Sequence, residues 1–452
     1  MTKCIRVFIS LSLCLLMLAG CVDNGPVPTE PQPSTQSTTA PTASTGATEP
    51  STEPSTAPTE PPVTKVSTAT VGTTGDILLH DLVIASGLDA STGEYNYDNI
   101  FKFLSTYASQ VDYAIANLEV TLCGPDRGYK GYPSFNSPDA IVDSLKAAGF
   151  DMLLTANNHC YDTGHEGFHR TQQVIAEKGL LNLGTRQEET DAAFRIQEVN
   201  GINIGMICYT YNTSQDDSGK VSLNGIPLSS GDSKLVNSFN YHRLESFYEK
   251  LSGELAQMKE QGADVTMLFI HWGNEYQTYT NSWQDKMSQQ LCELGVDVIV
   301  GNHAHVIQPI RLLTSEADEN RKTLCLYSTG NAVSNIYKVA NFPVETEDGM
   351  LFNVTFAKYS DGTVLLERAE VLPTWVHRYW DDDLGKRMYT ILPMSPDQDT
   401  WQEEMSLTDS LLQRCRDSYG RTMGIVGEGL SQANEWYAQN QQATEQLLGV
   451  TE

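Results

Sequence analysis

The stretch VDVIVGNHAHVIQ, residues 296–308, joins an apolar run to a glycine and two histidines. Its first half reads as a buried strand, because Val and Ile favour extended backbone on a packed surface. His303 and His305 follow this strand directly, with one residue between them. Two imidazoles in this position either end a strand as structural groups or begin a metal site, and the rest of the chain must decide between the two interpretations.

On both sides of this stretch, apolar strand patterns alternate with helical ones. Residues 137–150 carry a helix start signal, with Ser137 as the cap and Pro138 at the first helical position. Strand, helix and strand in repeated order indicate a parallel or mixed sheet with helices on its faces. The expected strands cover residues 67–79, 111–120, 151–158, 202–211, 263–273 and 296–302, and the expected helices cover 137–150, 241–262, 281–295 and a segment that begins near Gly164.

The pattern changes toward the C-terminus, where three segments read as strands connected by hairpins: residues 323–331, 350–359 and 363–373. Residues 360–362, Ser-Asp-Gly, form one of the turns. From about Trp375 the chain becomes polar and helical in pattern and carries no motif with a readable function. We therefore predict an α/β domain over residues 67–374, followed by a helical C-terminal extension over residues 375–452.

Side chains with ligand chemistry recur at one kind of place, the C-terminal end of an apolar strand. In open α/β sheets this edge is where ligands bind. Five strand ends supply two carboxylates, one amide and four of the nine histidines of the chain. These residues are Asp76, Glu119, Asn158, His159, His271, His303 and His305.

These residue types suit zinc, manganese or iron, because imidazole and carboxylate are ligands of those ions. Glu119 could bridge two cations held about 4 Å apart. Two histidines one residue apart on an extended segment place both rings on one face, so His303 and His305 could each reach a different ion. Asn158 offers a neutral oxygen, and the adjacent His159 could give a proton to a leaving group. The sequence therefore predicts a site for one or two divalent metal ions.

Six motifs occur in the order found in a known family: GDILL, NLEVTL, ANNHCYDTGHEG, HWGNEY, GNHAHVIQ and YSTGN. On these motifs, residues 68–340 resemble the capsule-synthesis CapA family, also called the poly-γ-glutamate synthesis or PGA_cap family. That family is similar to the calcineurin-like metallophosphoesterases. The resemblance implies a metallophosphoesterase-like α/β fold, a four-layer α/β/β/α sandwich, with a dinuclear metal site.

Matched position by position, the resemblance implies a role for each of the seven residues. His159 corresponds to the catalytic histidine of an Asn-His motif, and Glu119 corresponds to a carboxylate that bridges the metals. The other implied metal ligands are Asp76, Asn158, His271, His303 and His305. One position departs from the pattern: metallophosphoesterases usually place a histidine two residues after the first aspartate, where this chain has Leu78. His80 lies two residues further on, and the first metal has one ligand fewer.

Other polar residues near these motifs admit a structural interpretation. Asp162 and Gly164 fit a turn that leads into the next helix. Asn331 either positions the site or makes a turn. His165 and His169 lie four residues apart on one helical face; such a pair can bind zinc, but a solvated helix face is the commoner state.

The N-terminus carries a targeting pattern. Lys3 and Arg6 precede the apolar run VFISLSLCLLML, and LAG comes directly before Cys21. Small residues before a cysteine are typical of a bacterial lipoprotein signal, so we predict a signal peptide over residues 1–20 and lipidation of Cys21. Residues 21–66 are rich in Pro, Thr and Ser, which predicts a disordered tether.

The charge balance limits the partners of the chain. It contains 29 Lys and Arg against 57 Asp and Glu, a formal net charge of −28, which argues against a nucleic-acid partner. Six cysteines follow Cys21 singly, without a CxxC pair, and several stand in apolar runs where a buried thiol is expected.

These observations predict a lipid-anchored protein on the outer side of a bacterial membrane, with a metal-dependent hydrolase activity. The resemblance implies a role in the synthesis, export or anchoring of poly-γ-glutamate or a related capsule polymer, with the polymer or its synthesis complex as partner. The alternative is a non-enzymatic surface protein that binds the polymer or the complex and keeps a vestigial metal site. The residue at Leu78 favours this alternative.

Overall fold

The computed structural model of the chain describes residues 63–214, 219–337, 342–394, 402 and 404–450. The chain divides into two units, Met1–Thr59 and Glu60–Glu452, and every described residue belongs to the second. The signal peptide, Cys21 and the tether as far as residue 62 lie outside the described residues, so these expectations stay predictions.

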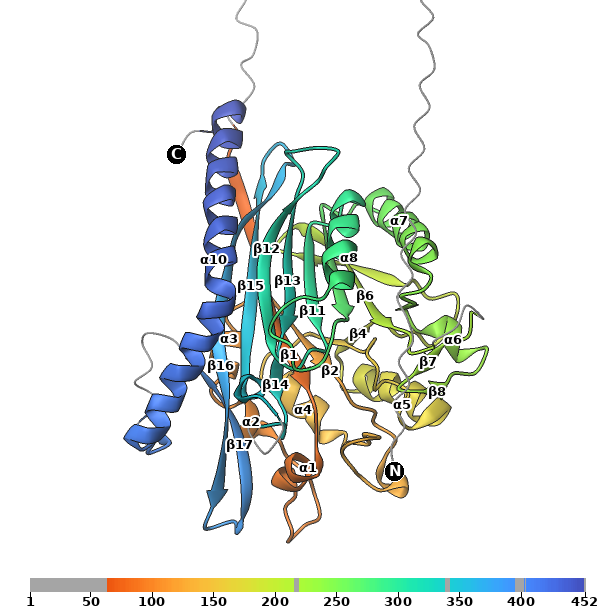
Figure 1. Ribbon diagram of the computed structural model, residues 1–452, viewed down its shortest axis with the longest axis vertical. Helices are drawn as coiled ribbons and strands as arrows, with labels where there is room; N and C mark the ends of the chain where they lie inside the picture. The colour runs from red at the N-terminus through yellow and green to blue at the C-terminus, as the bar shows by residue number, and fades with distance from the viewer. Residues whose placement is uncertain (1–62, 215–218, 338–341, 395–401, 403, 451–452) are drawn as a thin grey trace, which may run out of the picture. The chain divides into compact units, whose positions relative to one another are not determined.

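Two large sheets make up the described unit (Figure 1). In the first sheet, the parallel pairs extend to one edge and the antiparallel pairs to the other; in the second, the parallel pairs are central and an antiparallel pair lies at either edge. The first sheet contains, in spatial order, β17 (Lys386–Pro393), β16 (Val364–Asp381), β15 (Asp348–Tyr359), β1 (Lys65–Ile77), β2 (Tyr113–Leu118), β3 (Met152–Leu154) and β4 (Leu181–Leu183), with β14 (Asn331–Val333) beside β1. The second contains β12 (Ile307–Thr314), β13 (Lys322–Thr329), β11 (Val298–Asn302), β10 (Val265–His271), β6 (Ile202–Tyr211) and β5 (Phe194–Val199), with β9 (Ser238–Phe239) beside β6.

The helices and one small hairpin connect these strands. The hairpin pairs β7 (Ser222–Leu223) with β8 (Ile226–Pro227). The described helices are α1 (Asp81–Gly87), α2 (Asp98–Phe101), α3 (Ser105–Ala108), α4 (Ala140–Ala147), α5 (Gly164–Glu177), α6 (Asp232–Leu235), α7 (Leu244–Glu260), α8 (Ser282–Glu293) and α10 (Asp409–Leu448), with short 3₁₀ turns η1 (Pro125–Arg127) and η2 (Val344–Glu347).

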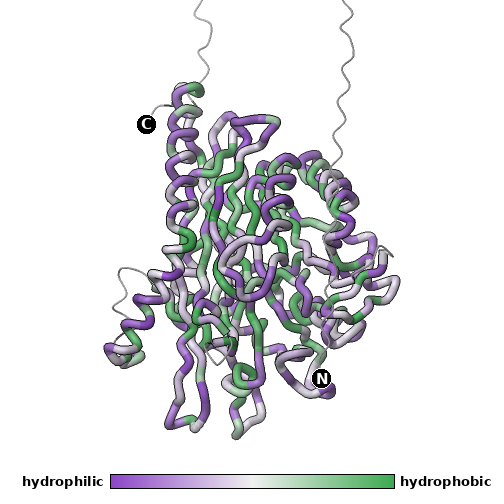
Figure 2. Tube along the Cα trace, viewed as in Figure 1, coloured by the Kyte–Doolittle hydropathy of each residue, from purple (hydrophilic) through white to green (hydrophobic). Residues whose placement is uncertain are grey.

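Three apolar clusters separate four layers, and Figure 2 shows the apolar residues gathered along the strands. The middle cluster joins the facing sides of the two sheets, with Ile115 of β2 and Phe269 of β10 among its members. The outer side of the first sheet packs against α1, α2, α4 and α5, and the outer side of the second packs against α7 and α8. This arrangement confirms the predicted α/β/β/α sandwich, because successive side chains of each central strand bury on opposite faces.

The predicted strands and helices are confirmed over most of the α/β part. Residues 202–211 are β6, and the turn at residues 360–362 connects β15 with β16. The helix expected from residue 137 begins at Ala140, and no side chain caps its first turn. Propensity alone places helix ends within a few residues, so such a shift is ordinary.

The expectation of helical structure from Trp375 is wrong for residues 375–393. This segment completes β16 and forms β17, which extend the first sheet as an antiparallel edge. The helix that follows, α10, begins at Asp409 and is capped by Thr408, whose side chain accepts a hydrogen bond from the Leu411 backbone N–H. Figure 1 shows α10, in blue, alongside β16 and β12, one strand from each sheet. The C-terminal segment is therefore part of the sandwich and covers its middle cluster, to which Val426 contributes.

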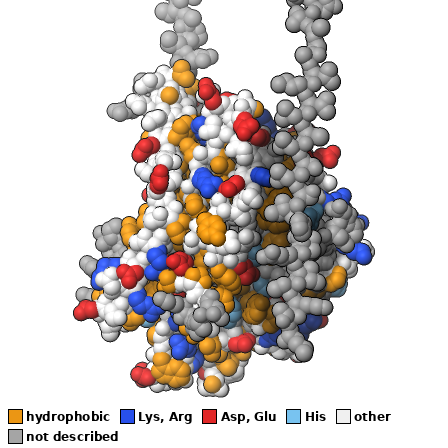
Figure 3. All heavy atoms as spheres, in the orientation of Figure 1, with side chains coloured by type: hydrophobic (Ala, Val, Ile, Leu, Met, Phe, Trp, Pro, Cys, Tyr) orange, Lys and Arg blue, Asp and Glu red, His pale blue; other side chains and the backbone are white. Residues whose placement is uncertain are grey.

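The described surface carries charges of both signs. On the face drawn in Figure 3, acidic and basic side chains are interspersed and neither kind forms a broad patch. Among the helices of the described ranges, none combines the length and apolarity needed to cross a bilayer. The six cysteines after Cys21 are buried and unpaired.

Candidate metal centre

The carboxyl ends of four central strands, two from each sheet, converge at one place. β1 ends next to Asp76, and β2 is followed by Glu119; β10 ends at His271, and β11 is followed by His303 and His305. Each of these side chains is buried. Adjacent parallel strands end at the same sheet edge, which explains how residues distant in the sequence meet here.

A close approach of two glycines helps to bring this edge together. Asp76 on β1 pairs with Asn331 on β14, and the Asp76 N–H donates to the Gly330 carbonyl at 3.0 Å. A Cβ atom at Gly75 would collide with that same carbonyl oxygen. Only glycine at position 75 therefore lets the two strands lie at this separation.

The acidic and imidazole groups form two sets that share one carboxylate. Asp76, Glu119 and His305 make one set, and Glu119, His271 and His303 make the other; within each set the ligand-type atoms lie within 4.8 Å of one another. Glu119 therefore occupies the position that a carboxylate needs in order to bridge two cations. Asn158 joins the second set, because its Oδ1 lies 2.7 Å from His271 Nε2.

The polar atoms of this cluster are incompletely paired. Glu119 Oε1, His271 Nδ1 and His303 Nδ1 are buried without a hydrogen-bond partner. Buried polar atoms left unpaired cost about 1–3 kcal/mol each, and native proteins contain few of them. The cluster combines such atoms with carboxylate, imidazole and amide donors, and this donor set fits a divalent transition ion. The described residues therefore include groups that could hold a metal.

Burial and mutual repulsion set the protonation of the two carboxyl groups. Burial, followed by the negative charge of Asp76, raises the pKa of Glu119 well above its ordinary value. Burial would also raise the pKa of Asp76, but a hydrogen bond from His305 and its positive charge lower it instead. In the absence of a cation Glu119 holds a proton beside the Asp76 carboxylate, and a cation between them would replace that proton.

The three histidines separate in the same way. Burial lowers the pKa of His271 to about 3, and burial with the charges of neighbouring imidazoles lowers the pKa of His303 well below 6.5. Burial also opposes the charged form of His305, but its contact with Asp76 at 3.1 Å raises its pKa. His271 and His303 are therefore neutral at physiological pH, which is the state in which imidazole binds metals.

The backbone at His303 and His305 differs from the extended segment predicted from the sequence. The segment is not extended: β11 ends at Asn302, and both histidines have positive φ, 96° and 54°. Their rings nevertheless reach different sets of the cluster, with centroids 6.0 Å apart. Positive φ at two non-glycine residues is uncommon and is typical of functional sites.

His159 lies beside the cluster and is held by a carboxylate that the sequence interpretation assigned to a turn. His159 Nδ1 lies 2.8 Å from Asp162 Oδ2, which also accepts the Phe135 N–H at 2.7 Å. A carboxylate only accepts, so Nδ1 carries the proton and Nε2 is left for other contacts. The i, i+3 spacing of a histidine and an aspartate was the signal that could have revealed this pair.

Three asparagines complete the surroundings of the cluster. Asn117 donates to Asp76 Oδ1 at 2.7 Å, and Asn331 Oδ1 lies 3.1 Å from His305 Nδ1. Asn331 is thus a positioning residue, one of the two roles left open for it. Asn224, in the β7–β8 turn, accepts from Asn158 Nδ2 at 2.9 Å and places its own amide nitrogen 3.1 Å from His159. Neither Asn117 nor Asn224 carries a sequence signal of such a role.

Leu78 and His80 do not supply the ligand that the sequence lacks. Leu78 is 1% exposed and belongs to the outer cluster of the first sheet. His80 precedes α1, accepts the Asn335 N–H at Nδ1 and packs edge-on against Phe135, and burial lowers its pKa to about 4. It belongs to neither of the two ligand sets.

A family model described as "Bacterial capsule synthesis protein PGA_cap" matches residues 70–336, more than half of the chain. The chain belongs to this family. The resemblance predicted from the six motifs is thereby confirmed.

Two relatives show how far the similarity of this PGA_cap chain extends. "PGA biosynthesis protein CapA" of Bacillus subtilis (strain 168) is 26% identical over 326 residues, 69% of this chain and 76% of the relative. "Capsule biosynthesis protein CapA" of Bacillus anthracis is 24% identical over 269 residues, 57% of this chain and 58% of the relative. The family match includes every residue of the candidate centre.

A pocket adjoins the candidate centre of this PGA_cap protein at His303. Its cavity volume is about 550 Å³, and Tyr211, Tyr241, Trp283 and Glu275 contribute to its walls together with asparagines and hydroxyl side chains. None of the described residues that line it is Lys or Arg. Aromatic walls with amide and hydroxyl groups suit a neutral polar group better than a dense polyanion.

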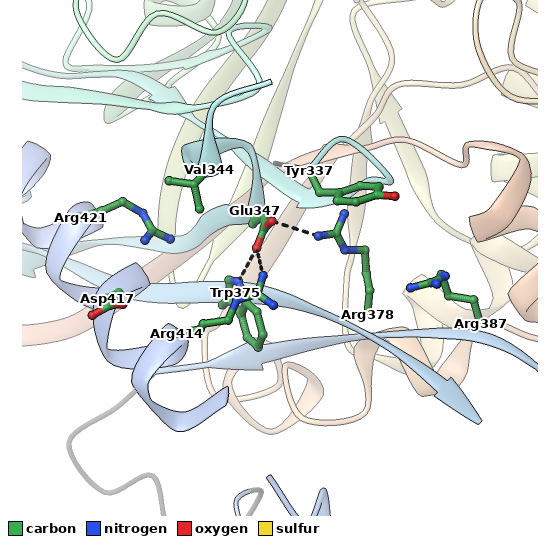
Figure 4. Close-up of a pocket in the computed structure, with 9 residues that line it drawn as sticks. All are labelled: Tyr337, Val344, Glu347, Trp375, Arg378, Arg387, Arg414, Asp417 and Arg421. Atoms are coloured by element: carbon green, nitrogen blue, oxygen red, sulfur yellow. Dashed lines mark hydrogen bonds and ion pairs between the residues drawn. The ribbon is translucent and has the colours of Figure 1, made fainter. Parts of the chain in front are cut away.

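A second pocket, of about 570 Å³, is lined by several arginines and by no residue of the centre (Figure 4). There Glu347 accepts from Arg378 at 3.0 Å, from Arg414 at 2.6 Å and from the indole of Trp375 at 3.1 Å. Arg421 is engaged by Asp348 through two bonds of 2.7 Å. These pairs fasten α10 to η2, β15 and β16, so Arg378, Arg414 and Arg421 serve the fold.

Proposed function

We propose that this protein is a metal-dependent hydrolase that acts on a capsule polymer, or on a precursor of one, outside the cell membrane. The observation that carries the proposal is the convergence of Asp76, Glu119, His271, His303 and His305 into one buried cluster with unpaired ligand atoms. Membership of the PGA_cap family and the names of the two CapA relatives support the capsule as its setting.

In the proposed reaction, each polar side chain of the centre has its own role. A divalent cation held by the cluster would supply Lewis-acid polarisation of the acceptor oxygen and activation of water. His159, oriented by Asp162 at Nδ1, would act in its imidazolium form, give the Nε2 proton to the leaving group and keep the Nδ1 proton. Asn158 would offer Oδ1 as a neutral ligand to the cation, while its amide nitrogen donates to Asn224. The reaction proposed is hydrolysis of a phosphoester or an amide bond.

The pocket beside His303 would hold the part of the substrate next to the cleaved bond. Its aromatic and amide lining supports recognition of a hydroxyl- or amide-bearing group, and Glu275 disfavours several carboxylates at once. We therefore propose a neutral polar segment at the cleaved bond, even if the remainder of the polymer is anionic.

The N-terminal expectations complete the proposal. A diacylglyceryl group on Cys21 would anchor the protein to the bacterial membrane, and residues 22–66 would act as the tether. The capsule polymer or its synthesis complex would be the partner. Radiolabelled fatty acid should enter the wild type and not a Cys21→Ala variant.

The activity is tested by metal analysis and two assays, one with a chromogenic phosphodiester and one following the chain length of poly-γ-glutamate. We expect His271→Ala to lose metal and at least about 10²-fold in turnover, because it removes an imidazole that contacts both Glu119 and Asn158 in the second ligand set. His377→Ala is the matched control, since His377 is also buried but lies on β16. Full activity in a metal-depleted His271→Ala protein would contradict the proposal.

The second candidate function is non-enzymatic binding of the polymer or of its synthesis complex. Leu78 favours it, because a leucine packed in the core stands where a further ligand is expected. Metal bound with no turnover on either substrate, together with binding of the polymer that survives in His159→Ala, would support this candidate.

A further inference from the structure

A second group of ligand-type side chains lies outside the candidate centre, between α5 and α6. His165 and His169 are four residues apart on α5, so their imidazoles emerge on one helical face. Asp232, the first residue of α6, lies against both: Oδ1 is 3.0 Å from His165 Nδ1 and 2.9 Å from His169 Nε2. The three residues offer ligand atoms that all lie within 4.8 Å of one another.

We propose that His165, His169 and Asp232 form a second cation site, one that takes Zn²⁺ or a similar transition ion. Two imidazoles and a carboxylate are a frequent set of three protein ligands for zinc, with the fourth position left for water. The exposed fractions agree with a site that is open to water on one side, since the side chain of His165 is 71% exposed and that of Asp232 is 3% exposed. Ligand atoms around tetrahedral zinc lie about 3.3 Å apart, slightly more than the 3.0 and 2.9 Å that separate Asp232 Oδ1 from His165 Nδ1 and His169 Nε2.

The partners of the two His169 ring nitrogens are compatible with a cation bound at Nε2. Its Nε2 faces Asp232 Oδ1, and its Nδ1 faces Gln187 Oε1 at 3.3 Å. The orientation of that amide is fixed, because Gln187 Nε2 donates to the His169 carbonyl at 3.0 Å. A neutral imidazole has one N–H and cannot satisfy two acceptors. Either a second proton or a cation on Nε2 satisfies both contacts. With a cation, Nδ1–H donates to Gln187 and orients the ring, as is usual for metal-bound histidines.

Asp232 is equally prepared for a ligand role. Tyr161 donates its phenol hydroxyl to Oδ2 at 2.6 Å, which leaves Oδ1 directed at the two histidines. Burial would raise the pKa of Asp232, but the hydrogen bonds from Tyr161, His169 and His165 lower it to about 2. The buried carboxylate is therefore ionised at neutral pH and already oriented.

The position of this site gives it a structural consequence. Asp232 and Asn224 lie in one segment of the chain, Ser222–Leu235, which packs against Phe168 of α5. A cation at the second site would hold this segment against α5. Asn224 also contacts Asn158 and His159, so, where the proposed function holds, the second ion would steady the proton donor of the reaction.

The test is the zinc content of the full chain after equilibrium dialysis against Zn²⁺. We expect the His165→Ala/His169→Ala double variant to bind one zinc ion per chain fewer than the wild type. Because His165 is exposed and His169 is 26% exposed, the double variant should keep its fold, which circular dichroism checks. Gln173→Ala, an exposed change on the same helix, is the control and should leave the zinc content unchanged.

Two further variants make the result decisive. Tyr161→Phe retains all three ligands but loses the hydroxyl that orients Asp232, so its affinity at the second site should fall by about 10–100-fold. His271→Ala should release zinc from the candidate centre and leave the second site filled. Equal zinc content in the folded double variant and the wild type would overturn the second site, whatever happens at His271. Loss of zinc from the double variant but not from His271→Ala would support it and count against the proposed function.

Discussion

At the residue scale, the chemistry of the centre depends on side chains that act through one another. His159 is the proposed proton donor, but its ring is oriented by Asp162, and Asp162 is fixed by the Phe135 N–H. Asn331 has the same relation to His305. These supporting groups decide whether the reacting nitrogen points at the substrate or away from it.

Asp162→Asn should lower turnover by about 10²-fold while metal content stays unchanged. The amide has the same shape, and its oxygen can still accept from both the Phe135 N–H and the His159 Nδ1–H, since both contact the same oxygen of Asp162, but the negative charge that stabilises the protonated imidazole is lost. Steady-state kinetics across pH, with metal analysis of the same samples, are the measurements. The pH profile should change along with kcat, which a loss of folded protein alone would not cause. Asp143→Asn, an exposed change, should behave as the wild type, and equal kcat in the two variants would refute the role of Asp162.

The sequence identifies the candidate metal ligands more readily than the residues that position them. Asp76, Glu119 and His271 stand out because they follow apolar strands, and strand ends can be located from periodicity. Asn224 lies in a turn of the β7–β8 hairpin, and nothing in its neighbours indicates that it will contact His159. Such roles arise from tertiary contacts between loops, which periodicity does not specify.

At the element scale, the same distinction explains the error at residues 375–393. β16 is 18 residues long, and much of it is only partly buried, so its alternation of apolar and polar residues is weak. Its strand state is decided by pairing with β15 and β17 and by the packing of α10, all contacts distant in sequence. The central strands, buried on both faces, have no such ambiguity.

Glu347→Ala should destabilise the protein by about 3–5 kcal/mol, because it leaves the buried guanidinium group of Arg378 without its partner. Glu347 is 2% exposed and Arg378 is 9% exposed, and the same carboxylate also engages Arg414 from α10. Urea unfolding provides the measurement. Glu370→Ala, which removes an exposed partner of Arg368, should cost less than about 1 kcal/mol. Equal losses in both variants would show that the ion pairs at the start of α10 do not stabilise the fold.

At the scale of the whole molecule, an acidic chain keeps several imidazoles neutral inside its fold. The net charge is −28. Burial nevertheless lowers the pKa of His80 and His377 to about 4 and that of His271 to about 3. The unfolded chain takes up these protons near pH 6.5, so it binds more protons than the folded state between that pH and about 4. These histidines therefore make the protein lose stability as the pH falls through this window.

The contribution of a single group can be isolated at His377, which lies far from every proposed metal ligand in sequence and packs between Trp375 and Tyr379 with ring centroids 5.3 and 5.2 Å away. Burial, then the charges of Arg414 and Arg378, hold its pKa at about 4. His377→Phe keeps a ring in this stack and removes the titration. Between pH 7.5 and 4.5 the wild type should therefore lose about 2–3 kcal/mol more than the variant, because only the unfolded wild type gains the extra proton. The opposing effect of Asp348, whose pKa burial raises to about 6, is present in both proteins and cancels. Urea unfolding at the two pH values measures the difference, and a gap between the proteins that does not change with pH would mean that His377 is protonated in the folded state.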